Sequence, residues 1–326
     1  MRTYPHGIAT LSPLPRRCLL IVAAIDIGTN SVQLVIAQRR NNTLEPILEA
    51  GTITRIGQGV DETRRLHPEA IHRTLDCLQL YADCIQQHHA DRVDAVITSA
   101  GRDAAGIEGF LEAASNILGC RPKVIVGEKE ALLTCRGALS GIEVEGPFAL
   151  YDVGGGSTEI VLGTTAQDGQ PAMRELFSLD IGCVRMAERH IHTDPPPRAE
   201  LCAVREAVDR ALAPLPCPQP GLAWIGVGGT ITSLVAVKMA LEPYRHDVVH
   251  GAELSVAEVT DLVERLAAMP MPERRQVPGL DPKRADVIVA GGCVVESLLR
   301  WSGQVTTVVS GRGVQWGLAH EASSQG

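Results

Sequence analysis

Aromatic side chains are scarce in this sequence, and that scarcity limits what its core can be made of. Phe, Tyr and Trp make up only 3% of the 326 residues, so the buried layers must rest on Leu, Val, Ile and Ala. Hydrophobic residues still reach 45% and charged residues 21%, a balance that excludes a disordered, collagen-like or coiled-coil chain. The length and this apolar content predict two ordinary domains, each with its own core.

A surplus of positive charge is also missing. The formal net charge is −8 and the isoelectric point is about 5.7, so no overall basic field exists to hold nucleic acid by counterion release. We therefore expect no nucleic-acid partner, and any anionic ligand must be held by local groups.

Cysteine patterns for disulfides and zinc are absent as well. The nine cysteines are an odd number and are never spaced as C-x-x-C, which favours a reducing, cytoplasmic location. The apolar stretch at 18–25 runs into Asp26 without a cleavage pattern, and no run approaches the roughly 20 apolar residues of a membrane helix. We expect no membrane partner, and a loose extension over residues 1–18.

Hydrophobic periodicity predicts strands and helices in alternation, which is typical of α/β folds. From Pro68 to Ile85, apolar residues recur at three- and four-residue steps, the stripe of an amphipathic helix with proline in its first turn. Short apolar runs before and after it have the character of strands. We expect strands over 19–26, 32–37, 93–98, 124–126, 148–153 and 159–162, and helices over 68–85, 103–118, 128–139 and 198–212.

The opening pattern returns in the second half of the chain. When Asp26 is aligned with Asp152, D-I-G-T-N-S-V-Q-L-V-I matches D-V-G-G-G-S-T-E-I-V-L in Asp, Gly, Ser and the late Val. Two similar halves are the natural inference. We place the boundary near Gly141, which predicts an N-terminal domain over residues 19–141 and a C-terminal domain over residues 142–326.

A strand that ends in a carboxylate and turns on glycine places backbone N–H groups beside an acid, which suits phosphate and a metal ion together. A single D-x-G turn is more often a hairpin whose Asp caps its own turn, but two copies in aligned halves favour the functional interpretation. A third glycine turn ends the apolar run at 223–230. The candidate phosphate-binding residues of the three turns are Asp26, Gly28, Thr29, Asn30 and Ser31; Gly154, Gly155, Gly156, Ser157 and Thr158; and Gly228, Gly229 and Thr230.

These turns resemble those of the actin, heat-shock ATPase and sugar-kinase superfamily, whose two related domains clamp a phosphate chain between facing hairpins. Within it, the chain resembles the exopolyphosphatase and guanosine pentaphosphate phosphohydrolase (Ppx/GppA) family. The resemblance implies two actin-like, ribonuclease-H-like α/β domains with a cleft between them. The matching motifs are A-I-D-I-G-T-N-S at 24–31, T-R-I-G-Q-G-V at 54–60, T-S-A-G-R-D-A at 98–104, G-E-K-E-A-L-L at 127–133, Y-D-V-G-G-G-S-T-E at 151–159, G-C-V-R at 182–185, G-V-G-G-T at 226–230 and R-A-D-V-I-V-A-G-G at 284–292.

The resemblance implies that Glu130, in G-E-K-E-A, orients or activates the attacking water. A Glu in the first turn of a helix also has a plain explanation in the helix dipole, and Glu128 is the competing acid at the same helix start. The family usually has two adjacent acids here, whereas this chain has Lys129 and Glu130. We expect the lysine to lower the pKa of Glu130.

The same resemblance places cations and a hydroxyl on the phosphate oxygens. Arg102 and Ser99 of T-S-A-G-R-D are the candidates, and the alternative for Arg102 is an ion pair with Asp103 or Glu108. Arg55 in T-R-I-G is a weaker candidate of the same kind, evenly balanced against a surface role.

Magnesium is the expected cofactor, because Mg²⁺ prefers few carboxylates together with waters and phosphate oxygens. Asp152 is the first candidate ligand, with Asp26 and Glu159 as further partners. For Glu159, a carboxylate that faces solvent from a strand is an equally good interpretation.

We therefore predict Mg²⁺-dependent hydrolysis of the terminal phosphate of inorganic polyphosphate. The alternative is the same cleavage on guanosine pentaphosphate, and less favoured are a kinase-type phosphotransferase or an inactive phosphate-chain sensor. Few aromatics are available to stack a base, which favours polyphosphate. The chain ends at Gly326, as expected of the short two-domain form, so short polyphosphates should suffice. Residues 310–317, S-G-R-G-V-Q-W-G, depart from the family pattern, and a homodimer is a possible assembly.

Overall fold

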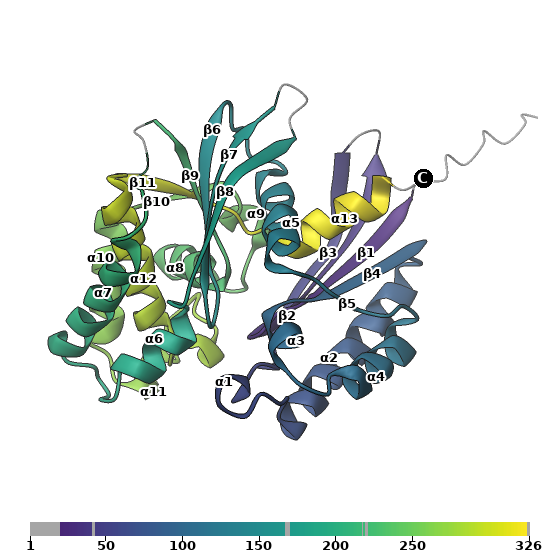
Figure 1. The fold of residues 1–326 in the computed structure, drawn as a ribbon, viewed down its shortest axis with the longest axis horizontal. Coiled ribbons are helices and arrows are strands. Elements are labelled where there is room, and N and C mark those ends of the chain that lie inside the picture. Colours follow the sequence, from purple (N-terminus) through teal and green to yellow (C-terminus); the bar gives the residue numbers. More distant parts are fainter. Residues whose placement is uncertain (1–19, 41–42, 167–169, 217, 219–220, 325–326) are drawn as a thin grey trace, which may run out of the picture.

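The computed structural model describes residues 20–40, 43–166, 170–216, 218 and 221–324. Two β-sheets with helices against their faces lie side by side, the first formed by the purple and blue part of the chain and the second by the teal to yellow part (Figure 1). The predicted extension over residues 1–18 lies outside the described residues.

The first sheet has five strands in the order β3-β2-β1-β4-β5. Its first three strands form an antiparallel meander, and β4 and β5 continue the sheet in parallel. The elements of this half are β1 (Ile21–Ile27), β2 (Ser31–Arg40), β3 (Thr43–Ile53), α1 (Val60–Thr63), α2 (Pro68–Gln87), β4 (Arg92–Ile97), α3 (Ser99–Asp103), α4 (Glu108–Leu118), β5 (Lys123–Val124) and α5 (Gly127–Leu139).

The second sheet has six strands in the order β10-β11-β9-β6-β7-β8. Its elements are β6 (Pro147–Val153), β7 (Thr158–Thr165), β8 (Pro171–Leu179), α6 (Cys183–His190), α7 (Arg198–Leu212), β9 (Ala223–Val227), α8 (Gly229–Lys238), α9 (His246–Val249), β10 (Ala252–Ser255), α10 (Val256–Ala267), α11 (Met271–Arg274), a 3₁₀ turn at Pro282–Arg284, α12 (Ile288–Ser302), β11 (Thr306–Val309) and α13 (Val314–Ser324).

The two sheets repeat one plan, as the internal sequence match predicts. The meander β6-β7-β8 corresponds to β1-β2-β3, and β9 and β11 continue it in parallel as β4 and β5 do. The register agrees residue by residue, because Asp26 pairs with Gln33 across the first hairpin and Asp152 pairs with Glu159 across the second. The prediction of two related α/β halves is confirmed.

Burial on both faces explains why the first strand is continuously apolar. Ala23, Ile25 and Ile27 of β1 pack in a cluster with α2 and α4, while the alternate residues Val22 and Ala24 pack with α13 on the other face.

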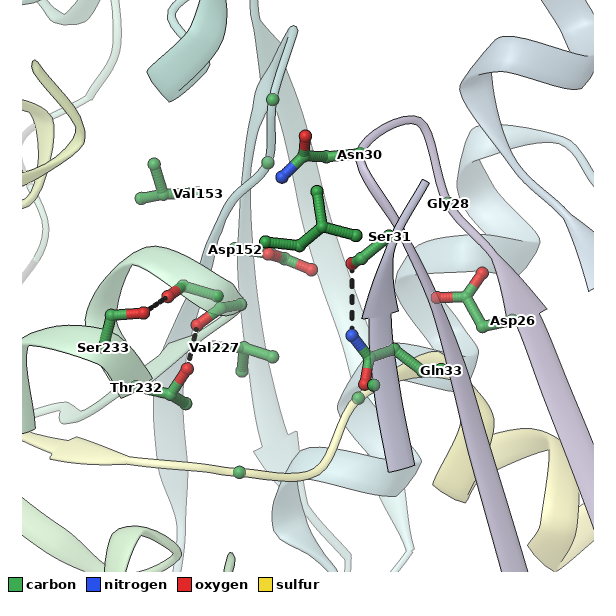
Figure 2. Close-up of a pocket in the computed structure, with 18 of the residues that line it drawn as sticks. Asp26, Gly28, Asn30, Ser31, Gln33, Asp152, Val153, Val227, Thr232 and Ser233 are labelled. Carbon is green, nitrogen blue, oxygen red and sulfur yellow. Dashed lines mark hydrogen bonds between the residues drawn. The ribbon is translucent and has the colours of Figure 1, made fainter. Parts of the chain in front are cut away.

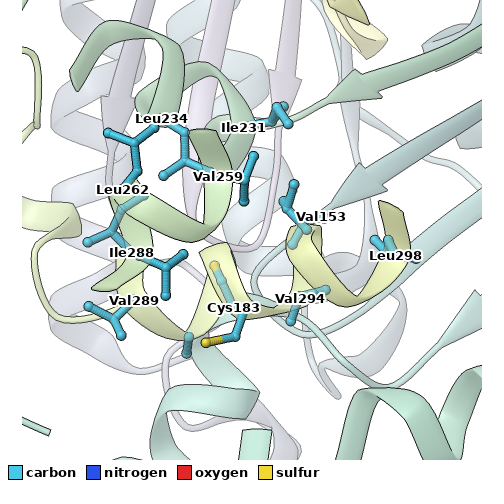
Figure 3. Packing of buried hydrophobic residues seen from close by; sticks show 14 of the residues in the cluster. Val153, Cys183, Ile231, Leu234, Val259, Leu262, Ile288, Val289, Val294 and Leu298 are labelled. Carbon is cyan, nitrogen blue, oxygen red and sulfur yellow. The ribbon is translucent and has the colours of Figure 1, made fainter. Parts of the chain in front are cut away.

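Strand β6 is sandwiched in the same way. Phe148 and Leu150 pack against α5, whereas Tyr151 and Val153 belong to the larger cluster formed with α6, α7, α8, α10 and α12. Figure 3 shows Val153 and Cys183 within this cluster, beside Val294 and Leu298 of helix α12, which is buried from Ile288 to Leu299.

Helices α5 and α13 cross between the two sheets (Figure 1). Helix α5 packs on the second sheet although it follows the strands of the first, and α13 returns from the end of the chain to the first sheet. Their backbones touch, since a Cβ added at Gly137 would lie 2.0 Å from the carbonyl oxygen of Gly313 and one added at Gly317 would lie 2.0 Å from that of Leu133. The division near residue 141 stays a prediction about folding units.

Several local expectations need correction. The helix expected over 103–118 is wrong at its start, because α3 ends at Asp103 and α4 begins only at Glu108. The strand expected at 124–126 is β5, which ends at Val124. Strands β3 and β8 escaped the sequence analysis because they lie at the edges of their sheets or beside solvent and have no continuous apolar run.

The seven cysteines within the described residues are free thiols. None of the helices in that part of the chain is both long and apolar enough to cross a membrane. The cytoplasmic location and the homodimer stay predictions.

The α5–α13 contact predicts opposite outcomes for two Gly→Ala substitutions in helices. Gly317→Ala should lower the free energy of unfolding by roughly 2 kcal/mol, because its methyl group meets the backbone of α5. Gly109→Ala should raise it by about 0.5 kcal/mol, because the exposed site in α4 has room for a methyl group and alanine lowers the conformational entropy of the unfolded chain. Urea unfolding measures both, and equal shifts for the two variants would contradict a backbone contact.

Candidate active site

A cleft of about 500 Å³ opens between the two halves, and most of the predicted site residues line it. Figure 2 shows Asp26 and Asp152 approaching from opposite walls, with Ser31 and Asn30 of the first hairpin between them. The predicted residues that the structure brings to the cleft are Asp26, Gly28, Thr29, Asn30, Ser31, Ser99, Glu130, Asp152, Gly154, Gly155, Gly156, Ser157, Glu159, Gly228 and Gly229.

The two hairpins are closed by the same hydrogen bond. The N–H of Gly28 donates to the carbonyl of Ser31, and the N–H of Gly154 donates to that of Ser157, both at 3.0 Å. These two N–H groups are therefore used inside the turns. The tips of the two hairpins meet, since a Cβ added at Gly155 would lie 3.7 Å from the Cβ of Asn30.

The second hairpin rests on the start of α6. The carbonyls of Gly154 and Gly155 accept the N–H groups of Cys183 and Val184, each at 2.9 Å, and Gly156 accepts that of Gly182 at 3.1 Å. The first N–H groups of α6 therefore hold the second hairpin in place.

Four of the carboxylates that line the cleft are those of Asp26, Glu130, Asp152 and Glu159, and burial raises the pKa of each of these. Burial is the largest cause for Asp26, whose pKa lies well above its usual value, and the charges of Glu130 and Asp152 add to it. Burial raises the pKa of Asp152 to about 7, with further contributions from Glu159 and Glu130. The site therefore resists full ionisation unless a cation is present.

Glu130 lies in the first turn of α5, where its carboxylate is held by Arg102 of α3. Its Oε2 accepts a hydrogen bond from Nη1 of Arg102 at 2.7 Å, and the same nitrogen donates to the carbonyl of Ile125 at 2.8 Å. Of the two acids named as alternative partners of Arg102, Glu108 instead pairs with Arg121, and the side chain of Asp103 lies outside what the structure describes.

The pKa of Glu130 is raised, contrary to the expectation from Lys129. Burial raises the pKa of Glu130, and the hydrogen bond and charge of Arg102 oppose that shift. Lys129 instead points to α13, where its ammonium group pairs with Glu321. Successive residues of a helix point to different faces, so Lys129 does not contact Glu130 although it is next to it in the sequence. Glu128 is exposed and outside the cleft lining, which leaves Glu130 as the acid of this helix in the site.

The carboxylates suit a hard cation that is also held by water and phosphate. The Oδ1 atom of Asp26 is buried without a hydrogen-bond partner among the described residues, and Asp152 lies in the opposite wall. Glu159 also lines the cleft, where the Ser178 hydroxyl donates to its Oε1 at 2.9 Å. No three His, Cys, Asp or Glu side chains in the described ranges converge on one point, so the protein alone does not form a complete cage. One or two carboxylates are what Mg²⁺ requires.

Gly228 must be glycine for two reasons. Its φ of 93° lies in the left-handed region, and a Cβ there would lie 2.4 Å from Oδ1 of Asp152. The third glycine turn is therefore packed directly on the Asp152 carboxylate.

Four predicted phosphate-binding residues do not line the cleft, and one of them, Arg102, is instead bound to Glu130. Thr158 is fully buried and its hydroxyl donates to the carbonyl of Ile181 at 3.1 Å, and Thr230 is buried against Gly291. Arg55 lies beside the cleft and pairs with Asp286 of the other half at 2.9 Å. Its partner is 231 residues away, beyond the reach of local sequence patterns.

The sequence analysis missed cationic and aromatic residues of the cleft. Arg284 packs its guanidinium on Gly229, where a Cβ would lie 2.2 Å from Nη1. Arg312 also lines the cleft and stacks on Trp316, with its Cζ 3.9 Å from the ring centroid. The aromatic ring of Tyr244 is a further lining group. Arg284 begins the R-A-D motif and Arg312 falls in the variant 310–317 segment. The sequence analysis noted both segments but assigned no role to either arginine.

Comparison with known proteins identifies relatives over nearly the whole chain. Residues 35–323 match the Ppx/GppA phosphatase family. Exopolyphosphatase 2 of Mycobacterium tuberculosis is 39% identical over 86% of this chain and 90% of its own length. A guanosine-5'-triphosphate,3'-diphosphate pyrophosphatase of Vibrio atlanticus is 28% identical over 92% of this chain, which spans 59% of that protein. The crystal structure of the Aquifex aeolicus member of the Ppx/GppA family superposes with a TM-score of 0.80 at 33% identity, covering 94% of this chain and 98% of that one.

Burial of Asp152 predicts a pH-dependent effect of removing its charge. Because its folded pKa of about 7 exceeds the ordinary value of 3.8, the contribution of Asp152 to wild-type stability is greatest at low pH and falls as pH rises towards 7. Asp152→Asn stays neutral, so its advantage in unfolding free energy over wild type should grow by roughly 2 kcal/mol between pH 5 and pH 8.

The measurement is chemical unfolding at both pH values in a buffer that contains a chelator. Glu145→Gln, which removes an exposed carboxylate before β6, is the matched control and should show no such growth. An advantage of Asp152→Asn that shrinks with pH would contradict the buried, repelled state of this carboxylate.

Proposed function

Because the chain belongs to the Ppx/GppA phosphatase family, we propose that it removes the terminal phosphate of inorganic polyphosphate as orthophosphate. It is a hydrolase of the phosphatase type. The observation that carries the proposal is the Glu130–Arg102 pair in a cleft whose walls are two matching Asp–Gly hairpins.

Glu130 takes the role of general base. Hydrolysis needs a group that accepts a proton from water as its oxygen attacks the terminal phosphorus, and a carboxylate of raised pKa does this better than an ordinary one near neutral pH. Arg102 holds that carboxylate in place and favours its ionised form. A new P–O bond forms to water, the bridging P–O bond breaks, and the shortened chain leaves with the electron pair.

Asp152 and Asp26 would hold Mg²⁺, with Glu159 as an outer partner. When bound, the ion polarises the terminal phosphoryl group and offsets the charge that collects there. The buried, partnerless Oδ1 of Asp26 and the raised pKa of Asp152 support this assignment, because both carboxylates gain a partner when a cation arrives.

Phosphate oxygens would be bound by the hairpin residues and by Arg284. Thr29, Asn30 and Ser31 of one hairpin and Gly155 and Ser157 of the other line the same cleft. Because the tips at Asn30 and Gly155 are in contact, a linear chain would lie along the cleft rather than between the tips. Arg284 supplies the cation that the hairpins lack.

Guanosine pentaphosphate is the second candidate, and one observation favours it. Tyr244 lines the cleft and is 40% exposed, with its ring edge-on to His246 at 4.8 Å between centroids. A ring of this kind can stack a base, so the scarcity of aromatics in the composition excludes less than expected. Transfer to a sugar or an acid, and binding without turnover, gain no support from the cleft.

The role of Glu130 predicts the effect of one isosteric change. Glu130→Gln should lower kcat for phosphate release from polyphosphate by roughly 10²-fold or more, because the amide can hold water but cannot accept its proton. Glu128→Gln, on the same helix turn but outside the cleft, is the control and should keep wild-type turnover. Near-normal turnover of Glu130→Gln in saturating Mg²⁺ would overturn the assignment.

A further inference from the structure

A second cavity of about 490 Å³ lies between the two halves, beside the cleft. Ile53 lines both hollows, and the segment from Leu280 to Asp286 contributes lining residues to each. The wall is also tied to the first hairpin, because the N–H groups of Thr54 and Arg55 donate to the carbonyl of Asn30 at 3.1 and 2.9 Å. The second cavity therefore continues from the tip of the hairpin at which the phosphate chain is proposed to bind.

The lining of this cavity is strongly cationic although the whole chain carries a net charge of −8. The lining holds four cationic side chains and one carboxylate, that of Asp286; the cations are Arg55, Arg73, Arg275 and Lys283. That carboxylate is already paired with Arg55, whose Nη2 lies 2.9 Å from Oδ2. The remaining three cations have no acidic partner among the residues that line the cavity.

The cations differ in how they are held. Arg73 is fixed by hydrogen bonds from Nε to the carbonyl of Thr54 at 3.0 Å and from Nη2 to Oε1 of Gln58 at 2.9 Å. Arg275 and Lys283 are exposed, and their side chains make no hydrogen bond or ion pair with the described part of the chain. Two cations are therefore available to an incoming anion, next to a third that is already oriented.

Two further features show that the cavity is a built surface. The hydroxyl of Thr54 is buried without a hydrogen-bond partner among the described residues, although Thr54 is only 1% exposed and lines the cavity. On the other wall, Arg274 is 2% exposed and its Nη1 donates to the carbonyl of Ala285 at 3.1 Å, which holds the segment that carries Lys283. Because Arg73 is already oriented and the backbone that carries Lys283 is fixed, little order has to be gained when a ligand binds.

We propose that this cavity binds the trailing phosphates of a polyphosphate chain whose terminal phosphate lies in the cleft. The inference rests on the proposed function. A chain with no bases offers only repeated anionic groups, and cations with free N–H donors in an open hollow match that chemistry. Binding at two connected places makes the second contact intramolecular, so chains long enough to reach Arg275 and Lys283 bind more tightly than short ones.

The test is the ratio of KM for tripolyphosphate to KM for long-chain polyphosphate. In the double variant Arg275→Gln/Lys283→Gln, KM for the long chain should rise roughly tenfold more than KM for tripolyphosphate, while kcat changes little. The double variant Arg174→Gln/Arg265→Gln removes the same charge from exposed positions outside both hollows and should leave the ratio at its wild-type value.

Two results would overturn the inference while leaving the proposed function intact. One is a wild-type ratio in Arg275→Gln/Lys283→Gln, and the other is an equal rise of KM for both substrates, which would place these cations at the reacting end or in the general field. A wild-type enzyme that releases no phosphate from either chain would instead remove the proposed function. Isothermal titration of long-chain polyphosphate into Glu130→Gln, and into Glu130→Gln that also carries Arg275→Gln/Lys283→Gln, then still reports whether the two cations contribute to binding.

Discussion

Buried carboxylates that face one another across a cleft are the constraint on which the rest of this molecule depends. Asp26 and Asp152 end equivalent strands of the two sheets, and Glu130 and Glu159 stand beside them. Burial raises the pKa of all four, and repulsion between carboxylates adds to the shift for Asp26, Glu130 and Asp152, so the arrangement costs stability when they ionise. A site whose repulsion is relieved by a cation favours cation binding, and the bound cation in turn attracts phosphate oxygens.

The fold holds these groups in place by repeating one hairpin and crossing two helices. Each Asp is followed by a glycine turn with the same closing hydrogen bond, and the second turn rests on α6. Helix α5 carries Glu130 on the face of the second sheet and touches α13, which belongs to the first sheet's core. The position of Glu130 between the hairpins therefore depends on packing from both halves, and Arg102 of the first half completes it.

How much of this the sequence predicts depends on whether the cause is local. The two hairpins, the helix at 198–212 and the residues of the cleft walls follow from short-range pattern and internal repetition. The exposed strands β3 and β8, the pairing of Arg55 with Asp286 and the burial of Thr158 depend on tertiary partners that no local spacing records. Lys129 shows the same limit, because its neighbour in sequence is not its neighbour in space.

The central claim is that the cleft cleaves a phosphate chain without needing a base attached to it. The most direct test is kcat/KM of the wild-type enzyme for orthophosphate release from short polyphosphate and from guanosine pentaphosphate, side by side and with and without Mg²⁺. The account predicts a higher kcat/KM for polyphosphate and loss of release without the metal. A clear preference for the nucleotide, or release that is unchanged without Mg²⁺, would contradict it.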